Sequence, residues 1–354
     1  MQKILIILDM KITCPICNEP GYLVRYKSGE HYYMRVDHMK YVDGKIVRRV
    51  CYLGKDTSML ASMVDEIMGN GSSRNNSSRK ILWFPGGDYY IAEDILLPRI
   101  EKLCVYDKCT FVEVFGGSGY VSQTINRARF GNIVYNDIDS RLVTFYKIVK
   151  ENPDLLTQLI ATLPYSRTIH RITKTLLKSG NRELAALEMA ALLFYGVNSS
   201  VNGIVAKAGF SYTTHPDKSK PKEFMSKTRN ILRLAAAWRD IIIENLDFRE
   251  VIKRYDSEKT VFYCDPPYVP TAKEYYGKQF TVDDLRDLAN MLTTIKGKFL
   301  LKLNDRSYSY IQDIMPESKY VVEHIELPLY HQVRKKENRD KWVMVLVSSK
   351  LSNE

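Results

Sequence analysis

After residue 80, the apolar positions of this chain follow two kinds of pattern. Short runs of β-branched and aromatic residues alternate with longer stretches in which apolar residues recur at helical spacing. Such alternation predicts an α/β fold in which helices cover a largely parallel sheet. The last two runs are separated by a basic segment and predict a closing hairpin. The predicted strands are Phe111–Val114, Ile133–Tyr135, Leu246–Phe248, Phe299–Asp305, Val321–Ile325, Trp342–Val347 and the run that begins at Val261.

Residues 1–68 show a different pattern, in which aromatic and polar residues alternate after a pair of cysteines. Asp43-Gly44 lies between two strand-forming segments, and this dipeptide favours the two-residue turn of a β-hairpin. In the register that such a turn sets, His38 faces Arg49. His38 and Cys51 are then diagonal neighbours on one face of the hairpin. The apolar segment before Met10 predicts a short leading strand, unless Met10 is the true first residue.

This N-terminal pattern favours a metal knuckle over a redox pair, because Pro20-Gly21 follows the second cysteine and prevents a helix there. We expect a structural zinc ion that stabilises a module too small for its own core. His31 competes with His38 as a ligand, and the alternative is a β-rich module without metal. The segment resembles small zinc-ribbon-like modules of archaeal and viral proteins, with the motif C-P-x-C…H…C-Y-x-G. The expected ligands are Cys14, Cys17, His38 and Cys51.

Residues 69–79 contain only glycine, asparagine, serine and arginine, and this composition predicts a flexible linker. The expected organisation is therefore an N-terminal zinc-ribbon-like module at 1–68, the linker at 69–79 and a larger domain at 80–354. Within the larger domain, residues from about 151 to 245 are largely helical by spacing and form an insert.

A glycine-rich turn predicts a ligand site in the larger domain. The strand Phe111–Val114 runs directly into Phe115–Gly119, and the helix-like segment Val121–Arg129 follows. This is the first βα unit of a dinucleotide-type fold. The next strand ends near Asp137, where such folds place the acceptor for the ribose hydroxyls. No basic run beside the turn holds a pyrophosphate, so a cationic nucleoside without phosphates fits at least as well as NAD.

Two further segments offer contacts to the same ligand. Gly86-Gly87 allows close approach of the main chain and Trp83 offers an aromatic wall, although a turn with a packed tryptophan is the simpler interpretation. Asp247 could accept a hydrogen bond from an adenine amino group while Phe248 packs alongside.

The segment V-F-Y-C-D-P-P-Y, Val261–Tyr268, suits methyl transfer to an exocyclic amino group. A strand ends at an acid, and two prolines stiffen the loop that follows. A carboxylate from Asp265 and the carbonyl of Pro266 can accept both hydrogens of a nucleobase amine and localise its lone pair for attack. Tyr268 then offers a face on which an extruded base stacks. The simpler alternative is a proline turn with one solvated acid.

Charge favours a polyanionic partner, because the formal net charge is +11 and the pI is about 9.1. Basic residues alternate with aromatic residues in the loop between 207 and 222, which suits a nucleic-acid surface or the solvated loop of a basic protein. We expect DNA contacts from Lys207, Tyr212, Lys218, Lys220 and Lys222.

Apolar runs are too short for a membrane span, and no secretory signal is visible, so a cytoplasmic location is expected. The six cysteines are accordingly expected to be reduced thiols or metal ligands.

Together, the glycine pair, the glycine turn, the acid after the second strand, the helical insert and D-P-P-Y resemble the Dam-type N6-adenine-specific DNA methyltransferases. The resemblance spans Ile81–Val347. It implies a Rossmann-like fold, with a seven-stranded mostly parallel sheet whose last strand is antiparallel, and double-stranded DNA as partner. It makes the insert the target-recognition region and S-adenosylmethionine the cofactor. It assigns catalysis to Asp265, Pro266, Pro267 and Tyr268, and cofactor binding to Trp83, Gly86, Phe115, Gly116, Gly119, Asp137, Asp247, Phe248 and Asp265.

One departure from the family pattern concerns the start segment. The family usually has Gly-Gly-Lys, whereas Asp88 stands at the lysine position here. Any contact made by that cation is therefore missing or comes from elsewhere. The glycine turn is also looser than usual at Gly116-Gly117.

Alternative functions use the same fold on RNA adenine, cytosine N4 or a protein glutamine. A further alternative is a DNA-binding protein whose methyltransferase body no longer catalyses. The sequence leaves open whether a restriction endonuclease acts with the chain.

Overall fold

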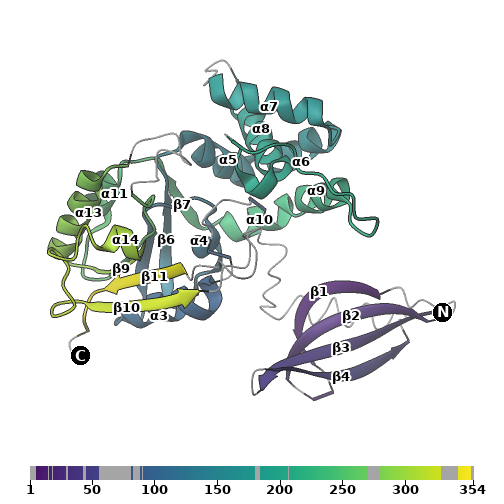
Figure 1. Ribbon diagram of the computed structural model, residues 1–354, viewed down its shortest axis with the longest axis horizontal. Helices are drawn as coiled ribbons and strands as arrows, with labels where there is room; N and C mark the ends of the chain where they lie inside the picture. Colours follow the sequence, from purple (N-terminus) through teal and green to yellow (C-terminus); the bar gives the residue numbers. More distant parts are fainter. Residues whose placement is uncertain are drawn as a thin grey trace. The chain divides into compact units, whose positions relative to one another are not determined.

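The computed structural model divides the chain into two compact units, Met1–Arg79 and Lys80–Glu354 (Figure 1). The boundary lies at the end of the predicted linker, although residues 69–79 themselves are outside the described part. The structure describes residues 5–14, 16–17, 19–28, 31–42, 45–55, 81–82, 88–89, 91–179, 184–205, 207–269, 280–327 and 342–351.

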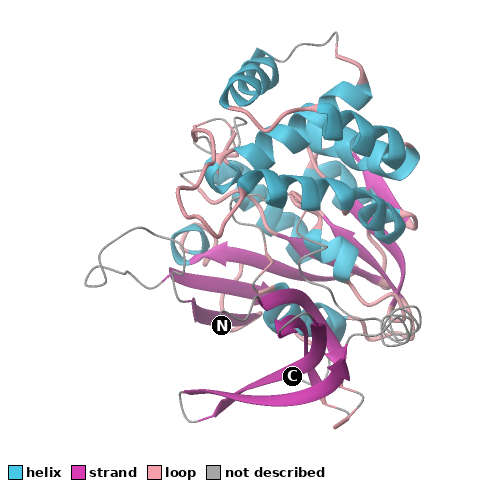
Figure 2. Ribbon diagram, turned by 90° about the vertical axis from the view of Figure 1, so that its right-hand side faces the viewer, coloured by secondary structure: helices cyan, strands magenta, loops and turns pink. Residues whose placement is uncertain are grey.

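The first unit contains a four-stranded antiparallel sheet in the order β1-β2-β3-β4. The strands pair in sequence order, and the register of β3 and β4 places His38 opposite Arg49, as predicted. The turn residues Asp43 and Gly44 lie outside the described residues. Irregular pairing in β1 and between β3 and β4 is consistent with the bend of this sheet in Figure 2. The strands are β1 (Leu5–Thr13), β2 (Pro20–Ser28), β3 (His31–Val42) and β4 (Lys45–Lys55).

The second unit is built on a seven-stranded sheet in the order β10-β11-β9-β8-β5-β6-β7. The five strands from β9 to β7 are parallel, and β11 is antiparallel to both of its neighbours. The predicted fold class and the closing hairpin are thus confirmed. The strands are β5 (Cys109–Glu113), β6 (Phe130–Asn136), β7 (Ile241–Glu244), β8 (Thr260–Cys264), β9 (Lys298–Asn304), β10 (Val321–Leu327) and β11 (Trp342–Ser348).

The strand order reverses between β5 and β8. From β5 the chain moves outward through β6 to β7, and it then returns to the other side of β5 with β8. Loops that leave the two central strands in opposite directions open a crevice at their carboxyl ends, and open α/β sheets bind ligands there. The glycine turn follows β5 and the D-P-P-Y loop follows β8.

Helices cover both faces of this sheet because successive strand residues point to opposite sides. Phe111, Ile133 and Tyr263 join one apolar core with α3, α5 and α8, whereas Val112, Val134 and Phe262 join a second core with α11 and α13. The helices are the π-helical η1 (Ala92–Leu96), α3 (Leu97–Leu103), α4 (Tyr120–Thr124), α5 (Ser140–Glu151), α11 (Phe248–Tyr255), α13 (Val282–Thr294) and α14 (Asp305–Tyr308).

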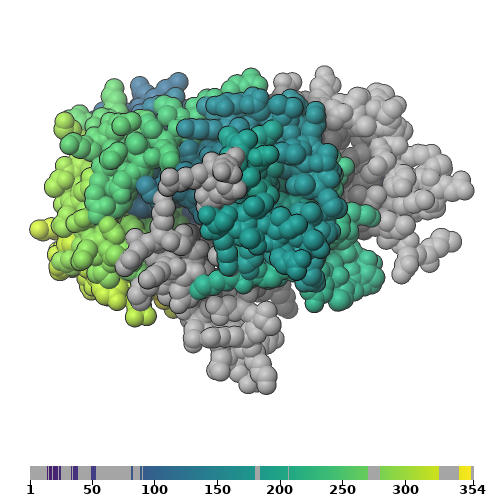
Figure 3. Space-filling view, turned by 90° about the horizontal axis from the view of Figure 1, so that it is seen from above, coloured from purple at the N-terminus to yellow at the C-terminus, as the bar shows by residue number. Residues whose placement is uncertain are grey.

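The insert is helical, as its apolar spacing predicts, and Figure 3 shows much of its surface in teal. It packs on the sheet domain through aromatic residues: the ring of Trp238 stacks on Tyr146 of α5 with centroids 3.6 Å apart. The insert contains α6 (Pro153–Thr162), α7 (Arg167–Ser179), α8 (Ala186–Ser199), the 3-10 turn η2 (Val201–Gly203), α9 (Lys220–Arg229) and α10 (Ile231–Trp238).

Three local predictions are wrong. The helix after the glycine turn ends at Thr124 instead of Arg129. The strand expected to include Leu246–Phe248 is β7, which ends at Glu244. Asp247 instead caps α11, because its carboxylate accepts a hydrogen bond from the Arg249 N–H. Cys104 and Cys109 are joined in a disulfide, since the end of α3 lies beside the start of β5 and brings the two Cα atoms within 5.8 Å.

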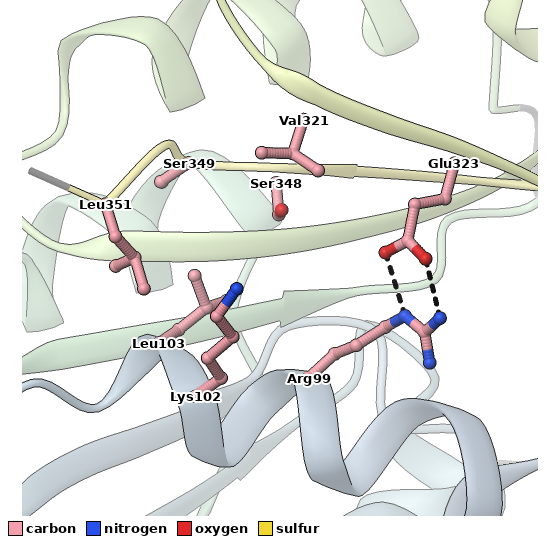
Figure 4. Close-up of a pocket in the computed structure, with 8 residues that line it drawn as sticks. All are labelled: Arg99, Lys102, Leu103, Val321, Glu323, Ser348, Ser349 and Leu351. Carbon is pink, nitrogen blue, oxygen red and sulfur yellow. Dashed lines mark hydrogen bonds and ion pairs between the residues drawn. The ribbon is translucent and has the colours of Figure 1, made fainter. Parts of the chain in front are cut away.

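A small pocket lies between α3 and the hairpin β10-β11 (Figure 4). A bidentate ion pair between Arg99 and Glu323 closes one side of it. Ser348, which also lines the pocket, pairs with Leu300 near the start of β9. The pocket is therefore away from the carboxyl ends of the central strands. No helix in the described part of the chain is long and apolar enough to cross a membrane.

Candidate active site and metal centre

The glycine turn and the D-P-P-Y loop leave adjacent central strands. Glu113, the last residue of β5, pairs with Tyr263 of β8. One step further, the N–H of Val114 donates to the carbonyl oxygen of Tyr263 at 2.9 Å. The two loops that the sequence predicts to carry cofactor and chemistry therefore begin side by side.

The glycines of the turn are required by what lies beneath them. A Cβ atom at Gly116 would overlap the ring of Tyr135, and one at Gly119 would overlap Trp238. Gly117 has a φ of +50°, which favours glycine, and its Cβ direction faces open space. The turn thus lies flat on an aromatic layer and presents its open side at Gly117.

The predicted ribose acceptor is attached to this turn. Asp137 follows β6, and its Oδ2 accepts a hydrogen bond of 2.8 Å from the Gly117 N–H. Its Oδ1 accepts another of 2.7 Å from the N–H of Asp139. The acid and the glycine turn, 20 residues apart, therefore form one loop cluster.

An aromatic cluster borders the same edge of the sheet. The ring of Phe115 lies 5.7 Å from that of Phe248 and 5.8 Å from that of Phe280. Asp247, beside Phe248, is half-buried at the start of α11. Phe115, Asp247 and Phe248 are thus brought together as predicted, whereas Trp83 and Gly86 lie outside the described residues.

Asp265 extends from the end of β8, and both of its carboxylate oxygens have partners. The Tyr268 hydroxyl donates to Oδ1 at 3.1 Å, and Nζ of Lys302 donates to Oδ2 at 2.7 Å. Its side chain is 18% exposed, so it can still be reached from the surface. Pro266 is buried, whereas Pro267 and Tyr268 are half-buried. The structure therefore holds the carboxylate in one orientation.

Asp88 belongs to this site, although sequence reasoning found there only a missing lysine. Its Oδ1 accepts a bond from Nζ of Lys302, and its Oδ2 accepts one of 2.6 Å from the Tyr263 hydroxyl. Lys302 lies on β9, next to β8 in the sheet. A cation from β9 therefore lies beside the position where the family has its lysine.

The charges of this group shift several pKa values. Burial, reinforced by the carboxylate of Asp88 and opposed by Lys302, raises the pKa of Asp265 to about 6. Although burial disfavours its charged form, the carboxylates of Asp265 and Asp88 raise the pKa of Lys302 well above its ordinary value. The pKa of Lys302 therefore lies well above neutrality, and the pKa of Asp265 lies above that of an ordinary aspartate.

Two buried polar residues that the sequence analysis missed hold the loops in place. Glu113 accepts hydrogen bonds from the main-chain N–H and the hydroxyl of Ser122 in α4, which fixes the helix to the glycine turn. Burial raises the pKa of Glu113 to about 8. Asn136 bonds the carbonyls of Val114 and Leu246 and accepts the Leu246 N–H. Both residues end strands at this edge, and that position is the signal that could have identified them.

Comparison with known families identifies the family to which this chain belongs. The model of the D12 class N6 adenine-specific DNA methyltransferases matches residues 94–337. The chain belongs to this family. The methyltransferase is 26% identical over 231 residues to the type II methyltransferase M1.LlaDCHI of Lactococcus lactis subsp. cremoris, an alignment that covers 60% of this chain and 78% of that protein.

Two further similarities are weaker. The methyltransferase is 26% identical over 223 residues to a protein of Haemophilus influenzae named as a methyltransferase, which covers 59% of this chain and 70% of that one. A solved structure of a transferase from Pyrococcus horikoshii aligns with 89% of this chain and 72% of its own, with 10% identity and a TM-score of 0.28.

In its first unit, the methyltransferase brings four side chains with metal-binding atoms together. The ligand atoms of Cys14, Cys17, His38 and Cys51 all lie within 4.8 Å of one another. The Cys17 Sγ lies 3.8 Å from the Cys51 Sγ and 3.4 Å from the His38 Nε2. Two sulfurs bound to one tetrahedral zinc ion are about 3.8 Å apart, because each Zn–S bond is about 2.3 Å. The donor set and its spacing therefore fit zinc.

A second contact orients the histidine. Nδ1 of His38 lies 3.0 Å from the carbonyl oxygen of Pro20, so the protonated Nδ1 can donate there and leave Nε2 as the ligand atom. His31, the competing candidate, is seven residues away at the other end of β3, about 23 Å along an extended strand.

The predicted DNA-binding loop is largely exposed. Tyr212 is 65% exposed, and Lys207, Lys218 and Lys222 are exposed as well. Lys220 differs, because its Nζ forms an ion pair with Glu223 at 2.6 Å. Four of the five predicted contact residues are thus placed on the surface.

A basic stripe on α7, which the sequence analysis missed, adjoins this loop. Arg167, Arg171, Lys174 and Lys178 recur at spacings of three and four and lie on one face of the helix, which contains no acidic residue. The guanidinium of Arg167 lies 5.2 Å from the ring centre of Phe210 and 5.4 Å from that of Tyr212. This helical spacing could have been found in the sequence.

Proposed function

We propose that this methyltransferase transfers a methyl group from S-adenosylmethionine to the N6 amino group of an adenine flipped out of double-stranded DNA. The observation that carries the proposal is the position of Asp265. It lies at the carboxyl end of β8, where the strand order reverses, beside the glycine turn of β5. An acid placed there, on a proline-stiffened loop, can act on a base next to a cofactor held by the turn.

The chemistry requires a site that accepts hydrogen bonds from a weak nucleophile. The N6 lone pair of adenine is delocalised into the ring, so the amine must be drawn toward tetrahedral geometry before it attacks. A carboxylate oxygen has two lone pairs, so Asp265 can accept an N6 hydrogen in addition to the bonds from Tyr268 and Lys302. The carbonyl of Pro266 accepts the second hydrogen. As the new N–C bond forms, Asp265 can take up the proton that N6 releases.

The edge of the sheet beside the glycine turn offers groups that suit S-adenosylmethionine. Gly117 faces open space, Asp137 is half-buried beside it, and the rings of Phe115 and Phe248 suit an adenine moiety. When bound, S-adenosylmethionine supplies an electrophilic methyl group on a cationic sulfur. We assign its ribose to Asp137 and its adenine to the cluster of Asp247 and Phe248.

DNA is the proposed substrate because the insert carries basic and aromatic side chains together. The stripe on α7 suits phosphate contacts along one strand, and Tyr212 is exposed beside Arg167. Lys207, Lys218 and Lys222 extend the surface along the neighbouring loop. Lys220 is a weaker candidate because Glu223 already neutralises it.

The first unit is proposed to bind one structural zinc ion through Cys14, Cys17, His38 and Cys51. All four ligand positions are filled by side chains, and this leaves no open position for catalysis. The metal therefore supports folding and takes no part in methyl transfer.

Transfer of tritium from labelled S-adenosylmethionine tests the proposal directly. Substrates are double-stranded genomic DNA that lacks N6-methyladenine and, in parallel, total RNA. Hydrolysis of the labelled product should yield N6-methyladenine from DNA. Label in N4-methylcytosine or in RNA alone would each replace the proposed substrate with another.

A further inference from the structure

Lys302 is a deeply buried cation beside Asp265. Its side chain is 2% exposed, and Nζ bridges the carboxylates of Asp88 and Asp265, whose side chains are 8% and 18% exposed. A buried lysine is costly unless it is paired and hydrogen-bonded. Here the pairing joins the start of the second unit, β9 and the D-P-P-Y loop across the carboxyl edge of the sheet.

We propose that Lys302 is a positioning residue that orients Asp265 for methyl transfer, and that Asp88 is its dedicated counter-ion. This proposal rests on the proposed function, in which Asp265 accepts the N6 hydrogens. The lysine holds Oδ2 at 2.7 Å while Tyr268 holds Oδ1 at 3.1 Å. With both oxygens held, the carboxylate plane is fixed and its remaining lone pairs face a set direction.

Asp88 has a distinct part in this arrangement. Its Oδ2 accepts the Tyr263 hydroxyl at 2.6 Å, so the tyrosine, which is itself on β8, sets the direction of the carboxylate. Asp88 in turn holds the ammonium group between β8 and β9. In this chain, the aspartate at the family's lysine position is paired with a lysine on β9.

Several other titratable groups face Asp265 and must be included in any pH argument. They are Glu113 from β5, Tyr263 and Cys264 from β8, and Tyr268 from its own loop. Burial raises the pKa of each, so these groups are largely neutral near pH 7. The charges that act on Asp265 there are those of Lys302 and Asp88.

Asp88 and Lys302 shift the pKa of Asp265 in opposite directions. The direction of the shift in each variant therefore distinguishes an electrostatic role from a purely structural one. Asp88 raises the pKa of Asp265 and Lys302 lowers it. Lys302→Met should therefore shift the acid limb of the pH–rate profile to higher pH, and Asp88→Asn should shift it to lower pH, each by about one pH unit or more. At pH 7 the Lys302→Met rate should fall at least about twofold, because a shift of one unit from a pKa of about 6 leaves about half of the Asp265 carboxylates ionised. Lys298→Met, on the same strand but half-buried, is the matched control and should leave the profile unchanged.

A second readout does not depend on turnover. The carboxyl ¹³C signal of Asp265, assigned by its loss in Asp265→Asn, is titrated in the full-length wild-type chain and in the variants. Its midpoint should rise in Lys302→Met and fall in Asp88→Asn. If Lys302→Met does not fold, the titration of Asp88→Asn tests the proposal by itself. In that variant the buried lysine keeps the carboxylate of Asp265 as a partner.

The outcomes separate the two proposals. A wild-type chain that methylates no DNA ends the proposed function, and the titration then tests the charge network alone. A wild-type chain that methylates DNA, with an unshifted midpoint and acid limb in Asp88→Asn, overturns the role of the pair. Wild-type turnover in a folded Lys302→Met variant would do so too.

Discussion

At the scale of single residues, the side chain of Asp265 determines whether this site can catalyse. Its carboxylate is the acceptor that the mechanism requires at N6, and loss of one such preorganised polar contact typically costs a factor of about 10² to 10³ in rate. Asp265→Ala should therefore reduce methyl transfer by at least about 10²-fold with folding intact. Steady-state tritium transfer and thermal unfolding measure the two quantities, and a folded variant with wild-type turnover would refute the assignment.

The raised pKa of Asp265 predicts how the rate depends on pH. Only the ionised carboxylate accepts both the N6 hydrogen and the released proton, and burial raises its pKa to about 6. The rate should therefore rise as pH increases through about 6 and then level off. A profile of kcat/KM from pH 5 to pH 9 checks this, and a rate that is flat between pH 5 and pH 7 would show that another group limits turnover.

The residues of the site differ in how far sequence could identify them. Asp265 stands out because two prolines follow it, and Asp137 because it closes a strand after a glycine turn. Lys302 could not be identified in this way, because a lysine within an apolar strand gives no sign of its partner. That partner, Asp88, is 214 residues away in the chain. The pairing of β8 with β9 places Lys302 beside β8, and the hydrogen bond from Tyr263 of β8 holds Asp88 there.

At the scale of elements, the glycine turn depends on the aromatic layer below it. Tyr135 packs against Tyr146 and Trp238, with ring centroids 5.0 and 4.9 Å away, and has little room to move. Gly116→Ala should therefore destabilise the unit by about 1–3 kcal/mol and weaken cofactor binding. Gly131→Ala is the control, since its Cβ would lie no closer than 3.4 Å to any neighbour. Equal stability of the two variants in urea would contradict this.

The stripe on α7 leads to a prediction about DNA affinity. Arg167 and Arg171 are exposed on one face of the helix, and each can neutralise one phosphate. Arg167→Ala combined with Arg171→Ala should weaken DNA binding and reduce the slope of log Kd against log salt by about 2. Arg286 of α13, whose side chain is paired with Asp313, is the control. Fluorescence anisotropy at several salt concentrations measures both slopes, and an unchanged slope would remove α7 from the interface.

Periodicity predicted the elements better than their ends. Short continuous apolar runs identified the strands, because a strand that contributes side chains to two cores is apolar on both faces. Leu246–Phe248 was misassigned as a strand because its composition is apolar. A capping aspartate before Phe248 starts α11 instead, and this local hydrogen bond is stronger evidence for a helix than the apolar neighbours are for a strand.

At the scale of the whole molecule, the two units rely on different sources of stability. The second unit has two extensive apolar cores, one on each face of its sheet. In the first unit the described residues form a single four-stranded sheet. The four metal-binding side chains lie near the start of β2 and beside the middle of the β3–β4 pairing. A module of this size usually needs a metal, a disulfide or a similar cross-link to fold independently. The converging ligand atoms of its cysteines and histidine are suited to provide that cross-link through a metal.

Removal of zinc should therefore unfold one unit and spare the other. Elemental analysis is expected to find one zinc ion per chain, and a chelator or Cys51→Ser should abolish the thermal transition of residues 5–55. The transition of the second unit should persist, because none of its described core residues is a metal ligand. His38→Ala should lose the metal, whereas His31→Ala should keep it, because His38 lies with the three sulfurs and completes a set of four ligands. A metal-free wild-type chain with the same two transitions would show that hydrogen bonds among these side chains are enough to stabilise the sheet.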